Sequence, residues 1–398
     1  MTEEEFMKGF TWITSLRPKI SYGYNGIMGP VASAALKIYA EQTMRPNHNE
    51  TSNYIDDLAN EKLTWEKMYE LNTGLEYAFF NRRISGEITY YNRKSIDLID
   101  VIYTSGIGGK RIKIGNIGNL KAHGIEFSVT TKNISTPTFS WSTSLNLNFH
   151  HSEITKLQQS ARIADAISNL GAPLLGYPQR GLFSIPFAGL NKDGIPTFYG
   201  KNGEIVYNID LQSREDIVSQ LKYEGPLEAK SYGGLINTLN YKNFGLTFGF
   251  VYRWGNVIRL DDAFSATYDD YRSFTKELKN RWILPGDENI TTIPAILDKR
   301  TMDKNSWYNM YELYNKSTER VTKGDFIRLK DISLSYTLPQ EISKKFYCNV
   351  LRVSLQATNL WLVYADKKLN GMDPEFFASG GVSLPIPKMY TFTLNVGF

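Results

Sequence analysis

The last stretch of the chain, Lys388 to Phe398, alternates between apolar and small polar side chains. Successive side chains of a β-strand point to opposite faces, so this alternation predicts a strand with one apolar face and one polar face. The apolar face carries Tyr390, Phe392, Leu394, Val396 and Phe398. The polar face carries Thr391, Thr393, Asn395 and Gly397. A soluble sheet can contain such a strand, but a chain that ends inside one is typical of an outer-membrane β-barrel, whose last strand faces both lipid and lumen.

Nine earlier segments also have the composition of strands. They cover residues 12–24, 65–80, 84–98, 122–132, 139–151, 231–241, 245–254, 326–337 and 350–361. The alternation is clearest from Phe139 to His151, where an apolar series opposes a series of Ser and Asn. The solvent-exposed face of a strand in a soluble β-sandwich more often carries charged residues, so this pattern favours lipid on one side of the sheet and a lumen on the other. The count predicts about ten antiparallel strands.

The connections between these segments alternate between short and long. Short connections lie at residues 81–83, 135–137 and 242–243. The long connections, such as Ser152 to about Lys230 and Gly255 to Gly324, run to roughly 20 to 75 residues, which is rare in compact soluble domains. Outer-membrane barrels combine short periplasmic turns with long extracellular loops. We therefore predict an all-β fold, an antiparallel transmembrane β-barrel with long extracellular loops. His150 and His151 would then lie at the end of a strand, next to a loop.

Composition excludes several other classes of protein. The 45 Lys and Arg residues nearly balance the 41 Asp and Glu residues, which does not favour a nucleic-acid partner. No apolar run reaches the roughly 18 residues that a transmembrane helix needs. The single cysteine, Cys348, fits neither an intramolecular disulfide nor a metal motif. The acidic start of the chain, Met1 to Glu5, is not a signal peptide.

Short sequence motifs spread along the chain resemble the carboxyl-terminal half of SusC/RagA-type TonB-dependent outer-membrane transporters. They are Leu16–Gly23, Asn81–Lys94, Asn116–Glu126, Tyr232–Gly234, Arg281–Asp287, Gly324–Tyr336, Ala357–Leu360, Asp373–Glu375 and the end from Leu384 to Phe398. Each motif alone is weak evidence for the resemblance. Together and in this order the motifs are specific, and they cover nearly all of the chain.

This resemblance implies a large barrel that an amino-terminal plug fills. It implies import of an oligosaccharide or a peptide, energised by the TonB complex, with a SusD-like lipoprotein as a lid over the extracellular mouth. The plug, the early strands, the TonB-contact segment and a signal peptide have no counterpart in this sequence. We therefore expect residues 1–398 to be the carboxyl-terminal part of such a barrel, about ten strands of a partial, open barrel in the cell outer membrane. A truncated product, a split gene or a mis-called start would each explain this, and the chain alone would not transport.

No catalytic constellation stands out, and we expect neither enzyme activity, nor a cofactor, nor a metal site. The four histidines are not placed near Ser or Cys in a triad pattern. The acid pairs Asp56-Asp57, Asp261-Asp262 and Asp269-Asp270 lie in predicted loops, where Ca²⁺ binding stays open and a solvated loop is the more common outcome. Four loop aromatics have near-helical spacing: Trp307, Tyr308, Tyr311 and Tyr314. They would pack a small helix against the loop or, less commonly, present a platform to a sugar ring or to the lid.

Two functional hypotheses follow. The first is a fragment of a nutrient importer, with the lipid bilayer, the barrel-assembly machinery, the TonB complex, a SusD-like lid and an oligosaccharide or peptide as its partners. In that case the terminal aromatic strand, ending at Phe398, is the segment that the assembly machinery reads. The second is a self-contained small β-barrel or a β-rich surface protein for binding or adhesion. The sequence does not specify the substrate.

Overall fold

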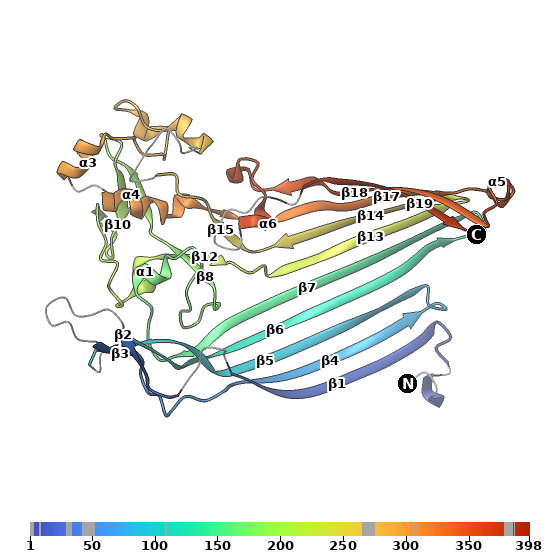
Figure 1. Cartoon of the computed structure of the whole chain (residues 1–398), viewed down its shortest axis with the longest axis horizontal. Helices are drawn as coiled ribbons and strands as arrows, with labels where there is room; N and C mark the ends of the chain where they lie inside the picture. Colours follow the sequence, from blue (N-terminus) through green and yellow to red (C-terminus); the bar gives the residue numbers. More distant parts are fainter. Residues whose placement is uncertain are drawn as a thin grey trace.

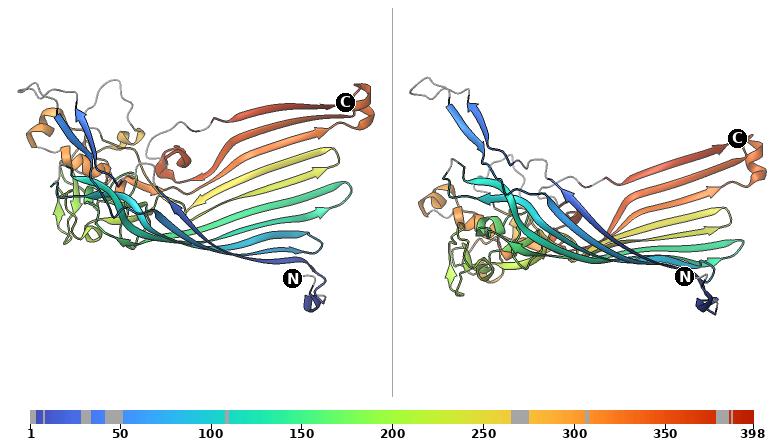
Figure 2. Two further views of the ribbon diagram at one scale, coloured as in Figure 1. Left: turned by 60° about the horizontal axis from the view of Figure 1, so that its bottom comes forward. Right: turned by 90° about the horizontal axis from the view of Figure 1, so that it is seen from below.

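A curved ten-stranded antiparallel sheet dominates the structure, a computed structural model (Figures 1 and 2). The structure describes residues 4–7, 9–28, 34–41, 52–107, 110–264, 275–305, 308–377, 385 and 387–398. The ten strands are β1 (Ile13–Ile27), β4 (Glu66–Phe79), β5 (Ile84–Tyr103), β6 (Ile112–Ser135), β7 (Phe139–Leu157), β13 (Ser231–Tyr241), β14 (Phe244–Trp254), β17 (Phe326–Thr337), β18 (Val350–Ala365) and β19 (Met389–Gly397). Each predicted strand therefore corresponds to one of these strands.

Every strand of this sheet pairs with its neighbour in chain order. The order is β1-β4-β5-β6-β7-β13-β14-β17-β18-β19, and all pairs are antiparallel. This confirms the prediction of consecutive antiparallel pairing. β1 and β19 are the two edges of the sheet, and between them the sheet curves into a trough.

The short turns gather at one end of the sheet, where both chain termini also lie (Figure 1). In the turn between β4 and β5, Asn81 and Arg82 have φ angles of 54° and 61°. A positive φ suits a tight hairpin because its twist matches that of the flanking strands. The fourth connection at this end, between β17 and β18, is longer because it contains helix α5 (Gln340–Lys345). The long connections leave from the opposite end.

Strands β5 and β6 extend further than the sequence predicts. The predicted segments end at residue 98 and begin again at residue 122, yet β5 runs to Tyr103 and β6 already starts at Ile112. Gly115 explains the difference, because a Cβ atom there would lie 2.5 Å from Cδ1 of Ile102 and 2.9 Å from Nδ2 of Asn60. A glycine inside a strand marks such a close approach. β7 likewise continues to Leu157, so His150 and His151 lie within a strand and the prediction of a loop end is wrong.

The long connections contain small sheets and short helices of their own. The small sheets pair β2 (Lys37–Glu41) with β3 (Ser52–Asp57), β8 (Gly181–Ser184) with β12 (Lys222–Pro226), β15 (Val257–Arg259) with β16 (Val321–Lys323), and β10 (Pro196–Tyr199) with β9 (Phe187–Leu190) and β11 (Ile205–Val206). The α-helices are α1 (Ile163–Ala166), α2 (Ile217–Gln220), α3 (Lys299–Asn305), α4 (Tyr308–Asn315) and α6 (Pro374–Phe377). The 3₁₀ turns are η1 (Glu5–Met7), η2 (Lys276–Asn280), η3 (Asp287–Asn289), η4 (Thr318–Arg320) and η5 (Lys367–Leu369). Among the described residues, no helix is long and apolar enough to cross a membrane.

The main hydrophobic core lies in these connections rather than under the large sheet. We call the described residues of 158–230 and 255–325 the loop body; they join β7 to β13 and β14 to β17. Its core includes Ile163, Phe183, Ile185, Phe198 and Tyr314, each at most 1% exposed. A soluble antiparallel sheet would cover one of its faces with a core of this kind. Here the core holds the loops together at one end of the sheet.

Candidate functional site

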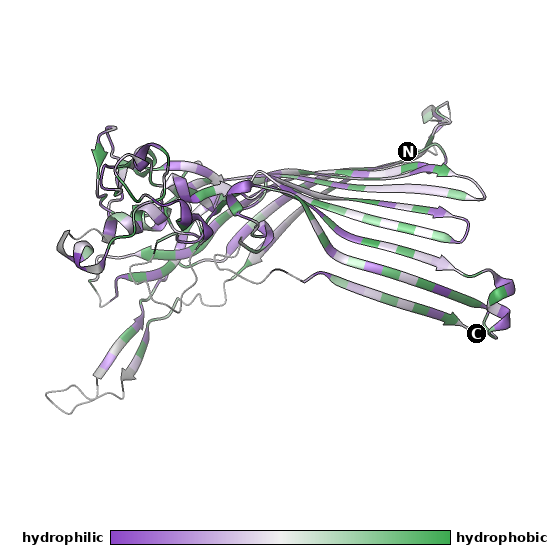
Figure 3. Cartoon of the chain, turned by 90° about the horizontal axis from the view of Figure 1, so that it is seen from above, coloured by the Kyte–Doolittle hydropathy of each residue, from purple (hydrophilic) through white to green (hydrophobic). Residues whose placement is uncertain are grey.

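One face of the large sheet is a continuous apolar surface. Residues directly opposite each other on neighbouring strands point to the same face. One such row crosses six strands and consists of Phe392, Leu355, Leu334, Leu246, Leu239 and Trp141. Phe392 is 65% exposed and Leu355 is 55% exposed. Figure 3 shows the same alternation of hydrophobic and hydrophilic bands along the strands. Such a surface suits contact with hydrocarbon chains.

The other face is polar and carries ion pairs between neighbouring strands. Glu76 of β4 pairs with Lys19 of β1 and with Arg17, whose Nη1 lies 3.3 Å from Oε2. Nζ of Lys19 also lies 3.5 Å from Oε1 of Glu87 on β5. Because these side chains are partly exposed, each pair adds little stability. Their arrangement shows which face of the sheet suits water.

Two glycines let aromatic side chains lie flat across neighbouring strands. Gly86 is directly opposite Tyr77, and a Cβ atom at Gly86 would lie 1.9 Å from the carbonyl oxygen of Ser128 and 2.7 Å from Oη of Tyr77. The Tyr77 hydroxyl donates to that same carbonyl oxygen at 3.2 Å. Gly124 opposite Tyr91 repeats the arrangement, with Cβ distances of 2.3 Å to a backbone carbonyl and 2.4 Å to the Tyr91 hydroxyl. No side chain fits at either position without moving the backbone.

We predict that Gly86→Val destabilises the sheet by about 1 to 3 kcal/mol, the usual cost of forcing extra atoms into a packed site. The measurement is the urea concentration at which half of the protein in isolated native outer membranes is unfolded. Protection of the sheet from protease reports the folded fraction. Gly23→Val on β1 is the matched control, because nothing lies within 4 Å of a Cβ atom there. Equal midpoints for the two variants would show that the contact at Gly86 has no importance.

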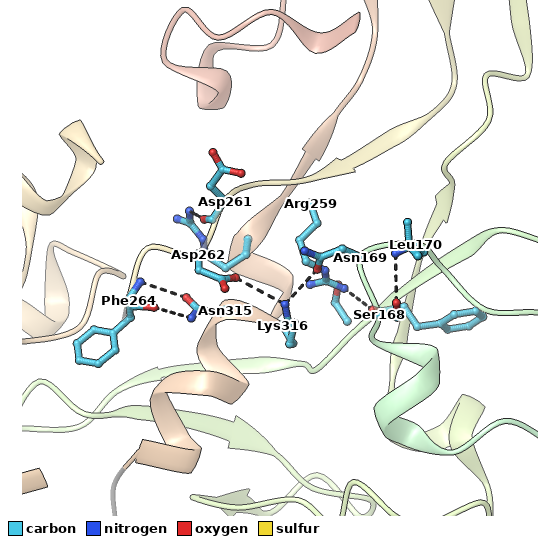
Figure 4. A network of polar contacts seen from close by, with 12 residues as sticks. Ser168, Asn169, Leu170, Arg259, Asp261, Asp262, Phe264, Asn315 and Lys316 are labelled. Atoms are coloured by element: carbon cyan, nitrogen blue, oxygen red, sulfur yellow. Dashed lines mark hydrogen bonds and ion pairs between the residues drawn. The ribbon is translucent and has the colours of Figure 1, made fainter. Parts of the chain in front are cut away.

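A polar network joins segments of the loop body that are far apart in sequence (Figure 4). Nζ of Lys316 donates to Oδ1 of Asn169 at 3.1 Å and lies 3.6 Å from Oδ1 of Asp262. The neighbouring Asn315 is fully buried and exchanges two hydrogen bonds with the backbone of Phe264, at 2.9 and 3.3 Å. The end of α4 is thereby attached to both long connections, which fixes its orientation.

Two arginines of the loop body are buried. Arg259 is 6% exposed and donates from Nη2 to the carbonyl oxygen of Phe183 at 2.6 Å and to Oγ of Ser184 at 3.3 Å. Burial lowers the pKa of Arg259 to about 10. Arg320 is 2% exposed, and its Nη1 lies 2.7 Å from Oε2 of Glu277. Burial works to lower the pKa of Arg320, but the hydrogen bond and charge of Glu277 outweigh it, so the pKa is raised. Glu277 thus supplies the counter-charge of a buried cation.

A third buried arginine attaches the connection after β18. Arg328 of β17 is 5% exposed, pairs with Asp373 and has its Nε 3.4 Å from Oε2 of Glu375. Both acids flank Pro374, at the start of helix α6. The motif Asp373–Glu375 therefore anchors this connection to the sheet.

The predicted site aromatics are placed as follows. Tyr311 and Tyr314 lie on α4 and are each 1% exposed. The Tyr311 ring packs against Phe264, with a centroid distance of 3.9 Å, and its hydroxyl donates to the carbonyl oxygen of Ala295 at 2.9 Å. Neither ring offers a free face to a ligand, so these two correspond to the packing alternative and do not form a platform. Tyr308 is the first residue of α4, and Trp307 lies outside the described residues.

Two of the acid pairs each have a member that faces a lysine, and the third pair lies outside the described residues. Oδ2 of Asp57 is 3.6 Å from Nζ of Lys37, and Asp262 pairs with Lys316 as described above. Asp269-Asp270 is outside the described residues. Within the described ranges, no three His, Cys, Asp or Glu side chains are grouped so that they could hold a metal ion.

The loop body also contains a groove of about 910 Å³ between the segment around α1, residues 208–211 and α4. Its apolar lining consists of Ala164, Ile167, Ile209, Leu211 and Leu313. Its polar lining includes Asp210, Glu312 and Lys316. Neither this groove nor the burial of these arginines was predicted from the sequence. The one available signal was a lone arginine within the apolar run Val257-Ile258-Arg259-Leu260.

Comparison with known proteins gives consistent matches. Residues 10–360 match a protein-family model described as TonB dependent receptor-like, beta-barrel. The TonB-dependent receptor SusC of Bacteroides thetaiotaomicron is 26% identical over 99% of this chain, which spans 38% of SusC. TonB-dependent receptor P3 of Formosa agariphila is 26% identical over 94% of the chain, which spans 37% of P3. In a solved structure of the RagAB peptide transporter, one chain superposes with a TM-score of 0.76 at 22% identity, over 100% of this chain and 42% of that one.

Proposed function

The chain belongs to the TonB-dependent receptor β-barrel family, and we propose that it forms part of the wall and mouth of an outer-membrane nutrient importer. The observation that carries this proposal is the pair of opposed faces of the ten-stranded sheet. The apolar row from Phe392 to Trp141 would contact lipid, and the ion pairs around Glu76 would line the lumen. This is the division of faces that a transmembrane barrel requires.

The gathering of the long connections at one end gives the proposed orientation. The short turns and both termini would lie on the periplasmic side, and the loop body would lie outside the cell. The loop body has a core and a polar network of its own, so it would present a shaped surface to a solute at the mouth. Residues 1–398 would then be the carboxyl-terminal part of the barrel.

The substrate and partners of the proposed importer are those of the whole receptor. The chain spans about two fifths of the curated relatives that it matches, 37% and 38% of P3 and SusC. We propose that the solute is an oligosaccharide or a peptide, that a SusD-like lipoprotein covers the mouth and that the TonB complex supplies the energy. The likeness to SusC and to the RagAB peptide transporter supports this proposal through family membership.

Uptake by living cells tests the proposal. Cells with an intact or a disrupted locus would receive a pool of fluorescein-labelled peptides and, separately, a pool of labelled oligosaccharides. We expect one pool to enter intact cells and not the disrupted strain, and we expect loss of TonB to abolish the same uptake. Uptake that is unchanged by both losses would contradict the proposed function.

We further propose that the terminal strand, with Tyr390, Phe392, Leu394, Val396 and Phe398, is read by the barrel-assembly machinery. Phe398 is 88% exposed at the free end of β19, where another protein can reach it. Deleting Phe398 should lower the amount of protein in the outer membrane several-fold, and Phe398→Tyr should restore it. Quantitative immunoblotting of isolated outer membranes gives the amounts. A normal yield without Phe398 would exclude this role.

A further inference from the structure

The groove between α1 and α4 combines an aliphatic floor with an acidic rim. Ile167 and Leu313 are buried, and Ile209 and Leu211 are half-buried. Asp210 and Glu312 are exposed and line the same groove. Its volume of about 910 Å³ is within the usual range for small-ligand sites. A ligand that fits this lining has an apolar stem and a cationic head.

The charges of the groove do not cancel. Lys316 lines the same groove as both acids, but its ammonium group donates to Asn169 at 3.1 Å and faces Asp262 at 3.6 Å. Oδ1 of Asp210 accepts a hydrogen bond from the backbone N–H of Gln212 at 3.0 Å, which leaves its negative charge in place. Among the described residues, neither Asp210 nor Glu312 has a cation within ion-pair distance. The rim therefore carries a surplus of negative charge.

Glu312 is also in an environment that disfavours its charge. Its pKa is raised, chiefly because the surrounding protein removes water from the carboxyl group and next because of the charge of Asp262, while Lys316 acts in the opposite direction. A carboxylate that has lost part of its hydration is stabilised by an approaching cation more than a fully hydrated one is. Glu312 is therefore the main candidate for contact with a cationic ligand.

We propose that this groove binds a basic side chain of a peptide. The methylene stem of that side chain would pack on Ile167 and Leu313, and its cationic head would lie at Glu312 and Asp210. Lysine and arginine combine an apolar stem with a charged head, and the stem packs on apolar surface while the head stays at a polar rim. A neutral sugar has neither part. The inference rests on the proposed importer function, and it selects peptides from the two substrate classes.

Binding to native outer membranes tests the assignment. The probes are two capped pentapeptides that differ only at the centre, one with lysine and the other with norleucine, which keeps the stem and lacks the charge. We expect the lysine peptide to bind roughly tenfold more tightly, the value for one charge-assisted contact. Glu312→Gln should remove most of this difference, and Asp210→Asn, which keeps the acceptor for Gln212, should reduce it. High salt should reduce it in the unaltered protein.

The matched control is Glu341→Gln, an exposed carboxylate on α5 at the opposite end of the sheet, which should leave the difference unchanged. Equal binding of the two peptides by the unaltered protein, or an equal loss in the control variant, would overturn the groove assignment. So would selective binding of oligosaccharides with no peptide binding. In each of these cases uptake that depends on the locus and on TonB could persist. The failure of the groove is therefore distinguishable from a failure of the proposed function, in which loss of the locus and loss of TonB leave uptake unchanged.

Discussion

Glu277→Leu is expected to destabilise the loop body by about 3 to 5 kcal/mol, because it leaves a buried charge without its partner. The side chain of Arg320 is 3% exposed, and Glu277 is the carboxylate within ion-pair distance of it. Without Glu277, the guanidinium keeps the carbonyl oxygen of Asp261 as an acceptor but loses its counter-charge. Hydrogen exchange at the amide of Leu260, which donates to the carbonyl oxygen of Arg320 at 2.8 Å, reports the free energy of local opening.

Two further variants test whether the loss of the counter-charge causes the destabilisation. Glu319→Leu is the matched control, since Glu319 is next to Arg320 in sequence and lies 4.0 Å from the exposed Lys368. Exposed pairs of that kind contribute about 0 to 1 kcal/mol, so this change should have little effect. Removing both partners, in Glu277→Leu/Arg320→Leu, should cost less than Glu277→Leu alone, because no uncompensated charge remains. A double variant that is less stable than the single one would contradict this account of the pair.

Leu394→Arg is expected to destabilise the membrane-inserted protein by about 2 to 4 kcal/mol, the cost of an arginine at the lipid-facing midplane of a barrel. Leu394 lies at the middle of β19, directly opposite Val353, and is 53% exposed. We assign it to the lipid-facing surface, together with Phe392 and Val396. The measurement is the heat-resistant folded band of the protein from native outer membranes on a gel, which should weaken strongly.

The control for Leu394→Arg is the neighbouring residue of the same strand. Asn395 points to the opposite face, where an arginine would remain in water. Asn395 is also directly opposite Arg352, so its replacement by arginine brings two like charges together, and Asn395→Gln is the better-matched change. The folded band should be normal for Asn395→Gln. A band for Leu394→Arg as strong as for Asn395→Gln would show that this face of β19 does not contact lipid.

The large sheet was predictable because its signals are local. The alternation of Leu394, Asn395 and Val396 and the short turn at Asn81 and Arg82 each depend on a few consecutive residues, and all ten strands carry such signals. Strand lengths were less predictable. Gly115 looks like a loop residue until its close contact with Ile102 is known, and that contact forms only after β5 and β6 pair.

The loop body was not predictable because its contacts are distant in sequence. Arg259 donates to Phe183, which is 76 residues earlier, and Lys316 donates to Asn169, which is 147 residues earlier. No window of sequence contains both partners. The near-helical spacing of Tyr311 and Tyr314 correctly indicated a helix, but only the fold shows that both side chains point into the core.

The polar network that joins the two long connections also limits how the sequence of the loop body can change among relatives. Asn169 and Ser184 come from the connection before β13, whereas Lys316 and Arg259 come from the connection before β17. A change on one side leaves a buried or half-buried partner unsatisfied on the other. Positions 169 and 316, and positions 184 and 259, should therefore covary across a lineage. Asp210, on the groove rim, accepts its hydrogen bond from the backbone of Gln212, two residues away, so position 210 should vary independently of the other connection.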